Sequence, residues 1–258
     1  MKTAAVLGSG PAGLLAAHAL VREHDITPVI YARGPRSIIH GAQFLHVAIP
    51  GIVSPEPDAA VKFEHWGVAE EYAMKVYGDA AAPCSWRAFG DEVPIWSMQR
   101  AYDELWMTYK DLVVPVELLK DQIAMVEDTF DLVISTIPAD ALCQNGAHNF
   151  EHATVWVTDK AQDGVPVPNC IVLNGVYSEP WYRSSNILGY GSTEWPGTLF
   201  DYQISELSAD QRVRVQKPLR TDCTCRPHVV RAGRFGEWKK GVLVHDAYNK
   251  VREVLNAV

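Results

Sequence analysis

Apolar and polar residues near the N-terminus follow two patterns in succession. Residues 4–7 form an uninterrupted apolar run, which predicts a short buried strand. From Ala12 onward the apolar residues recur at helical spacing, with Leu15, Ala16 and Ala19 on the same face. The sequence therefore predicts a strand, a glycine-containing turn over residues 8–13 and a helix.

The same two patterns predict elements along the rest of the chain. Short apolar or alternating runs predict strands at residues 27–31, 71–77, 112–116, 122–127, 154–157, 170–173, 185–189 and 229–232. The run at 130–142 predicts a buried parallel strand that ends in a Thr-Ile-Pro turn. Helices are predicted at 58–66, at 97–110 and from Gly241 onward, where one face carries Val244, Ala247, Val251, Val254 and Val258. Strands that alternate with helices indicate an α/β fold.

The turn after the first strand reads GSGPAG at residues 8–13, the spacing of a dinucleotide-binding loop. Gly8 permits the tight turn, Gly10 lets the backbone approach a pyrophosphate, and Gly13 lets the helix pack closely. Pro11 and Ala12 open the helix, whose N–H groups and dipole attract phosphate. A structural turn and a secretory signal peptide are the alternatives. The glycines and Pro11 interrupt the apolar run that a signal peptide needs, so the chain is expected in the cytoplasm.

The acidic residue that should contact the ribose is missing. In a βαβ unit an Asp or Glu about 20 residues beyond the glycines binds the ribose hydroxyl. This position falls near Ala32, which Arg33 follows. Arg33 and Arg36 would favour a ribose 2′-phosphate, as in NADP, or stack on an adenine, and the sequence leaves both interpretations open.

Composition and charge narrow the classes of function. The 258 residues are 48% hydrophobic, enough for one large domain or two small ones, and no apolar run is long enough to cross a membrane. Five cysteines without a CxxC argue against a disulfide framework and against a metal site, so Cys223 and Cys225 are interpreted as ordinary thiols. The net charge of −8 argues against a broad basic face.

Residues 212–240 differ from this average, with nine Lys or Arg against Asp222 and Glu237, which gives +7. Such a stretch is either a solvated face or a surface for cofactor phosphates, a nucleotide or DNA.

Three separate segments resemble the FAD-binding domain of the glutathione-reductase-type flavoproteins, particularly the amine-oxidase and UDP-galactopyranose-mutase branch. They are GSGPAG at 8–13, DLVISTIP at 131–138 and RAGRFGEWKKGVLVHDA at 231–247. The resemblance implies a Rossmann-like α/β FAD domain with a small α+β substrate domain. The implied FAD domain comprises residues 1–55, 111–160 and 226–258, and the substrate domain comprises 56–110 and 161–225.

The resemblance implies FAD as the cofactor and assigns further contacts to it. Gly233 and Gly236 would let the backbone approach the flavin, and Arg234 would bind a phosphate or carboxylate. The helix after Gly241 would direct its N-terminus at the flavin C2 carbonyl. The remaining implied contacts are Arg33, Gly41, Ala42, Gln43, Pro138, Trp238 and Val242.

Three residues are candidates for the chemistry itself. His46 titrates near neutrality and would take a proton from an ammonium, or is a structural histidine. Arg183 would hold a substrate carboxylate with Tyr182 as an aromatic wall, or is ion-paired in an aromatic core. Glu194 is expected at the surface. No GxSxG elbow and no HExxH motif occurs, which argues against serine and zinc hydrolysis.

The segment GAQFLHVAIPGI at 41–52, with KVYGD at 75–79, resembles small FAD-dependent proteins of bacteriophages. Some of these belong to gene clusters that hypermodify thymine in phage DNA, where they act as lyases on a base-linked glycine. The resemblance implies an amino-acid-type substrate, free or DNA-linked, whose C–N bond is oxidised to give an aminomethyl base and glyoxylate. It also implies the host cytoplasm, and with a DNA-linked substrate the basic residues 212–240 would contact the DNA phosphates. A mutase-like enzyme without net redox change and a flavin-binding module without turnover are the alternatives.

Overall fold

The computed structural model describes residues 3–35, 43–82, 91–197 and 212–256, and the chain divides into two compact units. The first unit comprises residues 1–55, 98–151 and 218–258, and the second comprises residues 56–97 and 152–217. Each unit is therefore assembled from segments that lie far apart in the sequence. No described helix is both long enough and apolar enough to cross a membrane.

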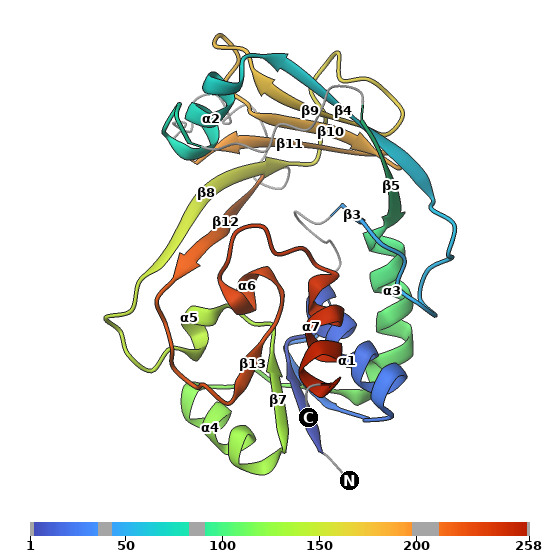
Figure 1. Cartoon of the computed structure of the whole chain (residues 1–258), viewed down its shortest axis with the longest axis vertical. Coiled ribbons are helices and arrows are strands. Elements are labelled where there is room, and N and C mark those ends of the chain that lie inside the picture. The colour runs from blue at the N-terminus through green and yellow to red at the C-terminus, as the bar shows by residue number, and fades with distance from the viewer. Residues whose placement is uncertain (1–2, 36–42, 83–90, 198–211, 257–258) are drawn as a thin grey trace. The chain divides into compact units, whose positions relative to one another are not determined.

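A five-stranded parallel sheet forms the centre of the first unit, in the order β13-β7-β1-β2-β6 (Figure 1). Its strands are β1 (Ala4–Leu7), β2 (Val29–Ala32), β6 (Val113–Pro115), β7 (Leu132–Ser135) and β13 (Val229–Arg231). In β1, Ala5 lies opposite Val29 of β2 and Val133 of β7. The near-continuous apolar character of β1 and β7 fits this central position, because strands of a parallel sheet are covered on both faces.

Helices cover both faces of this sheet. On one side lies α1 (Pro11–His24), against which α3 (Met98–Tyr109) and α7 (Asp246–Asn256) pack, and on the other lie α4 (Lys120–Thr129) and α5 (Ala139–Leu142) (Figure 1). The shorter elements are β3 (Phe44–Leu45), η1 (Lys110–Leu112) and α6 (Gly233–Glu237). The core beneath α4 and α5 consists of Ala5, Leu7, Ile123, Val126, Val133, Leu142 and Val229.

The second unit is built on a mixed sheet in which the strands follow the order β12-β8-β11-β10-β9-β4-β5. These strands are β4 (Ala59–Gly67), β5 (Glu92–Ser97), β8 (Phe150–Thr158), β9 (Cys170–Gly175), β10 (Arg183–Ile187), β11 (Tyr190–Pro196) and β12 (Arg212–Thr221). The helix α2 (Ala69–Tyr77) accompanies them. β4 runs parallel to β9, whereas the pairs β9–β10, β10–β11 and β11–β8 are antiparallel. Trp181 and Trp195 are the largest members of one of its apolar clusters.

Two sequence predictions in the second unit are wrong. The pattern at 58–66 predicted a helix, but these residues enter β4, where Val61 and Phe63 are buried and Lys62 is exposed with the two-residue period of a strand. The pattern at 71–77 predicted a strand, but these residues belong to α2. That helix ends at Gly78, which has a φ of 72° and caps it in the left-handed conformation.

Two predicted elements of the first unit also differ from the structure. Residues 122–127 predicted a strand but lie in α4, because Ile123 and Val126 bury one helical face and the Gln122 side chain accepts a hydrogen bond from the Leu119 N–H. The last helix begins at Asp246 rather than at Gly241, and the Asp246 carboxylate accepts a hydrogen bond from the Leu243 N–H at 2.7 Å. The whole of α3 belongs to the first unit, whereas the predicted division gave it to the second.

Candidate cofactor site and second-unit charge cluster

The turn between β1 and α1 is held by close backbone contacts. Gly8 has a φ of 107°, a conformation that favours glycine. A Cβ atom on Gly13 would lie 1.9 Å from the Gly8 carbonyl oxygen, so no side chain fits between the helix and the turn. The Gly8 N–H donates to the Tyr31 carbonyl of β2 at 2.9 Å. The turn is therefore as tight as a dinucleotide-binding loop requires.

The first turn of α1 is suited to an anion. Its N-cap, Gly10, is extended (φ −68°, ψ 176°) and makes no side-chain capping hydrogen bond, and the turn holds no acidic residue. Pro11 is the first helical residue, where its missing N–H costs no hydrogen bond. The Ser9 hydroxyl donates to the Gly34 carbonyl at 2.9 Å and fixes the loop beside the end of β2. The N-cap residue therefore has no side chain that would compete with an anion for the positive end of the α1 dipole.

The three segments of the resemblance come together in the first unit. A Cβ atom on Gly233 would lie 2.7 Å from the Ala12 Cβ, so the C-terminal segment contacts the start of α1. A Cβ atom on Gly236 would lie 2.5 Å from the Ser135 carbonyl oxygen at the end of β7. The Thr136 hydroxyl donates to the Leu7 carbonyl at 3.0 Å. Residues 8–13, 131–138 and 231–236 thus form one site at the carboxyl ends of β1 and β7.

The remaining N-terminal candidates for cofactor contact have other partners or lie outside the description. Arg33 forms an exposed ion pair with Glu117, which follows β6. Glu117 follows β6, the strand next to β2 in the sheet. Counting residues from the glycines to Ala32 could therefore not find this carboxylate. The Gln43 carbonyl accepts a hydrogen bond from the Met98 N–H at 3.4 Å. Gly41 and Ala42 lie outside the described residues.

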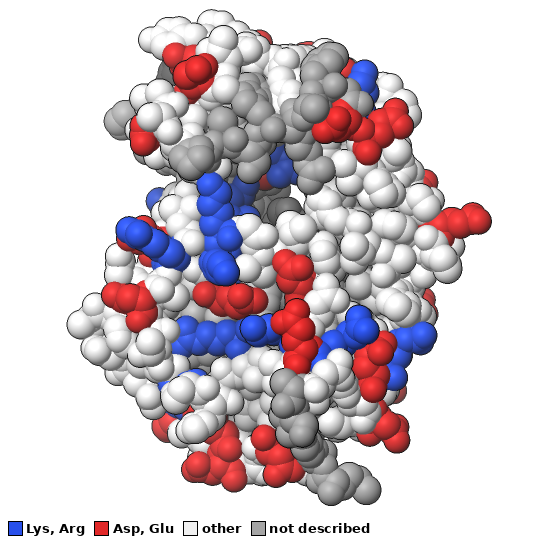
Figure 2. Space-filling view, viewed as in Figure 1, with Lys and Arg blue, Asp and Glu red and all other residues white. Residues whose placement is uncertain are grey.

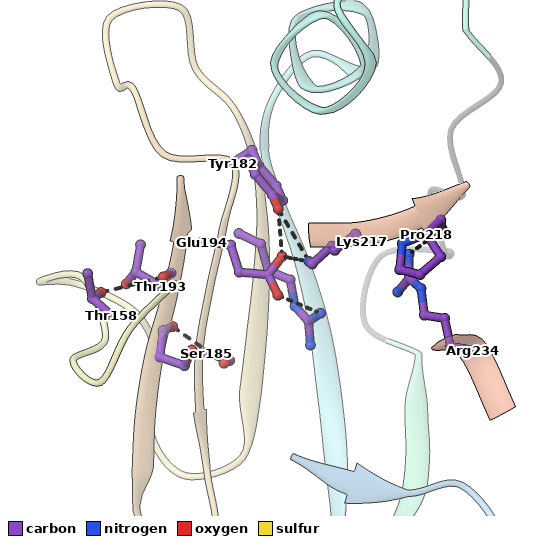
Figure 3. Close-up of polar contacts among 10 residues, drawn as sticks. Thr158, Tyr182, Ser185, Thr193, Glu194, Lys217, Pro218 and Arg234 are labelled. Atoms are coloured by element: carbon purple, nitrogen blue, oxygen red, sulfur yellow. Dashed lines mark hydrogen bonds and ion pairs between the residues drawn. The ribbon is translucent and has the colours of Figure 1, made fainter. Parts of the chain in front are cut away.

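The C-terminal candidates lie around α6. Arg234 Nη2 donates to the Pro218 carbonyl at 3.3 Å (Figure 3). Trp238 is buried, and its Nε1 donates to the Glu151 carbonyl at 2.9 Å, so the indole anchors the end of α6. Val242 is half-buried in the segment between α6 and α7. Pro138 precedes the first residue of α5.

His46 lies beside a second histidine that the sequence did not single out. The rings of His46 and His245 have centroids 6.0 Å apart, and Phe44 lies 4.7 Å from His46. His245 is buried, and its Nδ1 has no hydrogen-bond partner among the described residues. Burial lowers the pKa of His245 below its ordinary value, against the opposing charge of Asp246. The His245 ring is therefore neutral at pH 7.

Arg183 and Tyr182 belong to a charge cluster in the second unit that is centred on Glu194. Figure 3 shows Glu194 of this cluster between Tyr182 and Lys217. Register places Arg183 of β10 opposite Glu194 of β11, and the guanidinium Nη1 lies 3.5 Å from Glu194 Oε1. Glu194 Oε2 accepts a hydrogen bond from the Tyr182 hydroxyl at 2.8 Å and forms an ion pair with Lys217. The prediction that Glu194 lies at the surface is wrong, because it is only 5% exposed.

The electrostatics of this cluster fix its protonation. Burial opposes ionisation of Glu194, but the charges of Lys217 and Arg183 outweigh it and lower the pKa of the carboxyl to about 2. Burial, together with Glu194, raises the pKa of Tyr182 well above its ordinary value. Tyr182 therefore remains a hydrogen-bond donor. Of the two interpretations of Arg183 from the sequence, the ion-paired arginine agrees with its contact to Glu194.

The basic stretch at 212–240 is partly neutralised within the protein. Lys217, Arg220 and Arg226 form ion pairs with Glu194, Glu151 and Glu127. Arg214, Lys239 and Lys240 are exposed. On the face shown in Figure 2, Lys and Arg lie beside Asp and Glu instead of forming an unbroken basic surface.

Comparison with solved structures identifies the fold. Reduced UDP-galactopyranose mutase matches with a TM-score of 0.64 and 13% identity over 100% of this chain and 94% of its own. HpxO of Klebsiella pneumoniae in a complex with FAD matches with a TM-score of 0.55 and 12% identity over 100% and 81%. Xcc4156, a flavin-dependent halogenase of Xanthomonas campestris, matches with 0.55 and 11% over 99% and 70%. No protein-family model and no curated protein matches the sequence.

These likenesses show the fold. The chain has the Rossmann-like α/β architecture of FAD-binding enzymes, and the predicted fold class is confirmed. Identities this low carry no substrate or reaction from one protein to another.

Proposed function

We propose that the chain is an FAD-dependent oxidoreductase whose first unit holds the cofactor. The convergence of Gly8, Gly13, Gly233 and Gly236 on one site carries this proposal, because each removes a side chain where segments meet. Gly10 and the uncapped start of α1 would hold the pyrophosphate. FAD, when bound, supplies an acceptor for a hydride from the substrate.

Replacing Gly10 by Val tests the cofactor. The backbone of Gly10 has a φ of −68° and a ψ of 176°, which any residue adopts, so the variant should fold. Its side chain should block the pyrophosphate and expel FAD. We expect the native protein to purify yellow with one FAD per chain by native mass spectrometry, and the Gly10→Val protein to be colourless with an unchanged circular dichroism spectrum. NADP or no nucleotide in the native protein would contradict the proposal.

We further propose that the substrate is of the amino-acid type, specifically a glycine joined through nitrogen to the methyl group of thymine in DNA. The glycine α-carbon gives up a hydride and the amine gives up a proton, which leaves a carbon–nitrogen double bond. Water adds to it and the C–N bond breaks, which yields glyoxylate and the aminomethyl base. Molecular oxygen takes up the two electrons together with two protons, which gives hydrogen peroxide and completes the cycle.

The chain's own residues would bind and deprotonate such a substrate. His46 would take the ammonium proton, and because the adjacent His245 ring is neutral, it would not repel the charge that His46 gains. Arg183 would orient the glycine carboxylate, since its side chain is 26% exposed and keeps donors besides the Nη1 that faces Glu194. Tyr182 would position Arg183 through their shared partner Glu194.

Anaerobic mixing separates the candidate reactions. Glycinyl-thymine DNA should bleach the bound flavin without added reductant and release glyoxylate. Simple amines and free amino acids form the second arm, and a UDP-linked galactose with chemically reduced protein forms the third. Isomerisation of the sugar nucleotide without net redox change would support a mutase-like enzyme, in line with the likeness to UDP-galactopyranose mutase. No reaction in any arm would leave a flavin-binding protein without turnover.

Salt dependence tests the contact with DNA. If Arg214, Lys239 and Lys240 contact phosphates, turnover on DNA should fall steeply as salt rises, because each contact releases a counterion. Turnover on the free modified nucleoside should change little over the same range. Equal salt dependence of the two substrates would contradict a DNA contact through residues 212–240.

A further inference from the structure

Four metal-ligating side chains gather in the first unit, outside the segments that we assign to FAD. Cys143 and His148 lie in the loop between α5 and β8, and Cys223 and Cys225 lie in the loop between β12 and β13. One ligand atom from each lies within 4.8 Å of the other three. All four residues belong to the same compact unit, and their cysteines are free thiols rather than disulfides.

The distances in this cluster match those around a tetrahedral ion. His148 Nδ1 lies 3.4 Å from Cys143 Sγ and 3.6 Å from Cys225 Sγ. A zinc ion about 2.3 Å from sulfur and about 2.0 Å from nitrogen places two such ligand atoms about 3.5 Å apart at the tetrahedral angle. Both His148 distances agree with this spacing.

We propose that Cys143, His148, Cys223 and Cys225 bind a structural zinc ion. Three thiolates and an imidazole favour a soft tetrahedral metal over magnesium or calcium, which prefer oxygen ligands. Four protein ligands fill the tetrahedral coordination shell, so no position remains for a catalytic water.

Groups around the cluster would stabilise the thiolates. Three thiolates and one Zn²⁺ leave a net charge of −1, and the Arg231 guanidinium lies beside it. Arg231 Nη2 donates to Cys223 Sγ at 3.4 Å and to the Cys225 carbonyl at 2.8 Å. The Gln144 N–H donates to Cys225 Sγ at 3.4 Å. The Cys143 thiol donates to the Asn145 carbonyl at 2.8 Å, and this proton leaves when the sulfur becomes a ligand.

The proposed ion would join two loops that lie before and after the long second-unit segment in the sequence. The chain passes to the second unit after residue 151, shortly beyond His148, and returns at residue 218, shortly before Cys223. The second loop leads directly into β13 and α6, which carry Gly233 and Gly236. The ion would therefore close a long chain excursion and fix the start of the C-terminal cofactor segment.

Metal analysis of the whole protein with its flavin tests the proposal. We expect one zinc per chain by inductively coupled plasma mass spectrometry, and less than a tenth of that in Cys225→Ser and His148→Ala proteins. His148→Cys should retain the metal, because it preserves four soft ligands. Cys170→Ser is the matched control, since Cys170 is a buried free thiol in β9 outside the cluster. Chelation should lower the melting temperature of the native protein.

Cobalt decides the question even if the cysteine variants fail to fold. Co²⁺ added to reduced, metal-depleted native protein should produce the strong ligand-field bands of tetrahedral thiolate coordination in the red, where oxidised flavin does not absorb. No zinc in the native protein together with no such bands would overturn the proposal. Zinc that is retained in both Cys143→Ser and Cys225→Ser proteins, or iron in its place, would also overturn it.

Discussion

Replacing Glu194 by Gln should destabilise the second unit by an amount that depends on pH. The carboxylate is buried between Lys217, Arg183 and the Tyr182 hydroxyl, and the amide keeps its shape but removes its charge. The pKa of Glu194 is lowered from 4.5 to about 2. At 1.36 kcal/mol per unit, this shift is worth about 3 kcal/mol of unfolding free energy at neutral pH.

The sign of the pH dependence follows from the lowered pKa. A carboxyl whose pKa is lower in the folded state contributes its full stabilisation above its unfolded pKa of 4.5, and loses it as the pH falls towards about 2. The difference in unfolding free energy between native and Glu194→Gln proteins should therefore be constant from neutral pH to about pH 5. It should be about 1 kcal/mol smaller near pH 3.5.

Urea unfolding followed by circular dichroism over this pH range measures the difference. Glu151→Gln is the matched control, because Glu151 forms an exposed ion pair with Arg220 and the same chemical change there should leave the unfolding free energy nearly unchanged. Equal stability of native and Glu194→Gln proteins at pH 7 would refute the reasoning. A difference that stays constant down to pH 3.5 would refute it as well.

Three further predictions concern the first unit. Gly13→Ala should release FAD and lower the urea midpoint, because its Cβ would lie 1.9 Å from the Gly8 carbonyl oxygen, and unchanged flavin content would contradict this packing. Arg234→Ala should either weaken FAD binding ten- to hundredfold, the effect of about 1.5–3 kcal/mol, or shift the reduction potential of the flavin, while the urea midpoint stays the same. Titration of the apoprotein with FAD measures the affinity, and Arg214→Ala, at an exposed position, is the control. Between about pH 7 and pH 5 the native protein should lose more unfolding free energy than the His245→Gln protein. Because the pKa of His245 is lowered by folding, the unfolded chain binds a proton at His245 more readily than the folded chain does, and acid therefore favours unfolding. The same pH dependence of urea unfolding in both proteins would contradict this prediction.

The sequence predicted the fold best where an element depends on residues that are close together in the chain. The apolar run of β1, the glycines at 8 and 13, and the helical spacing of α1 lie within one short segment, so each supports the same interpretation. The C-terminal segment was recognisable because Gly233 and Gly236 keep a fixed spacing around an arginine. Short apolar runs without such signals were ambiguous, and β4, α2 and α4 were assigned to the wrong class for that reason.

Features built from distant residues could not be predicted in this way. The burial of Glu194 depends on Lys217 and Arg183, which lie in β12 and β10 and are far apart in the sequence. The cysteine and histidine cluster joins Cys-x4-His to Cys-x-Cys, and neither pair has the CxxC spacing that argues for zinc in a sequence. His245 follows α6 by several residues, and only the folded chain brings its ring to His46.

The strand order β13-β7-β1 has a consequence for the protein during its synthesis. β1 pairs with β7, and β7 completes its pairing with β13, so the glycine turn acquires its last neighbours only when residues 229–236 have left the ribosome. Until then a nascent chain exposes the unpaired edge of β7. If the first unit holds FAD as we propose, the cofactor would therefore bind only after nearly the whole interval between Gly8 and Gly236 has been translated.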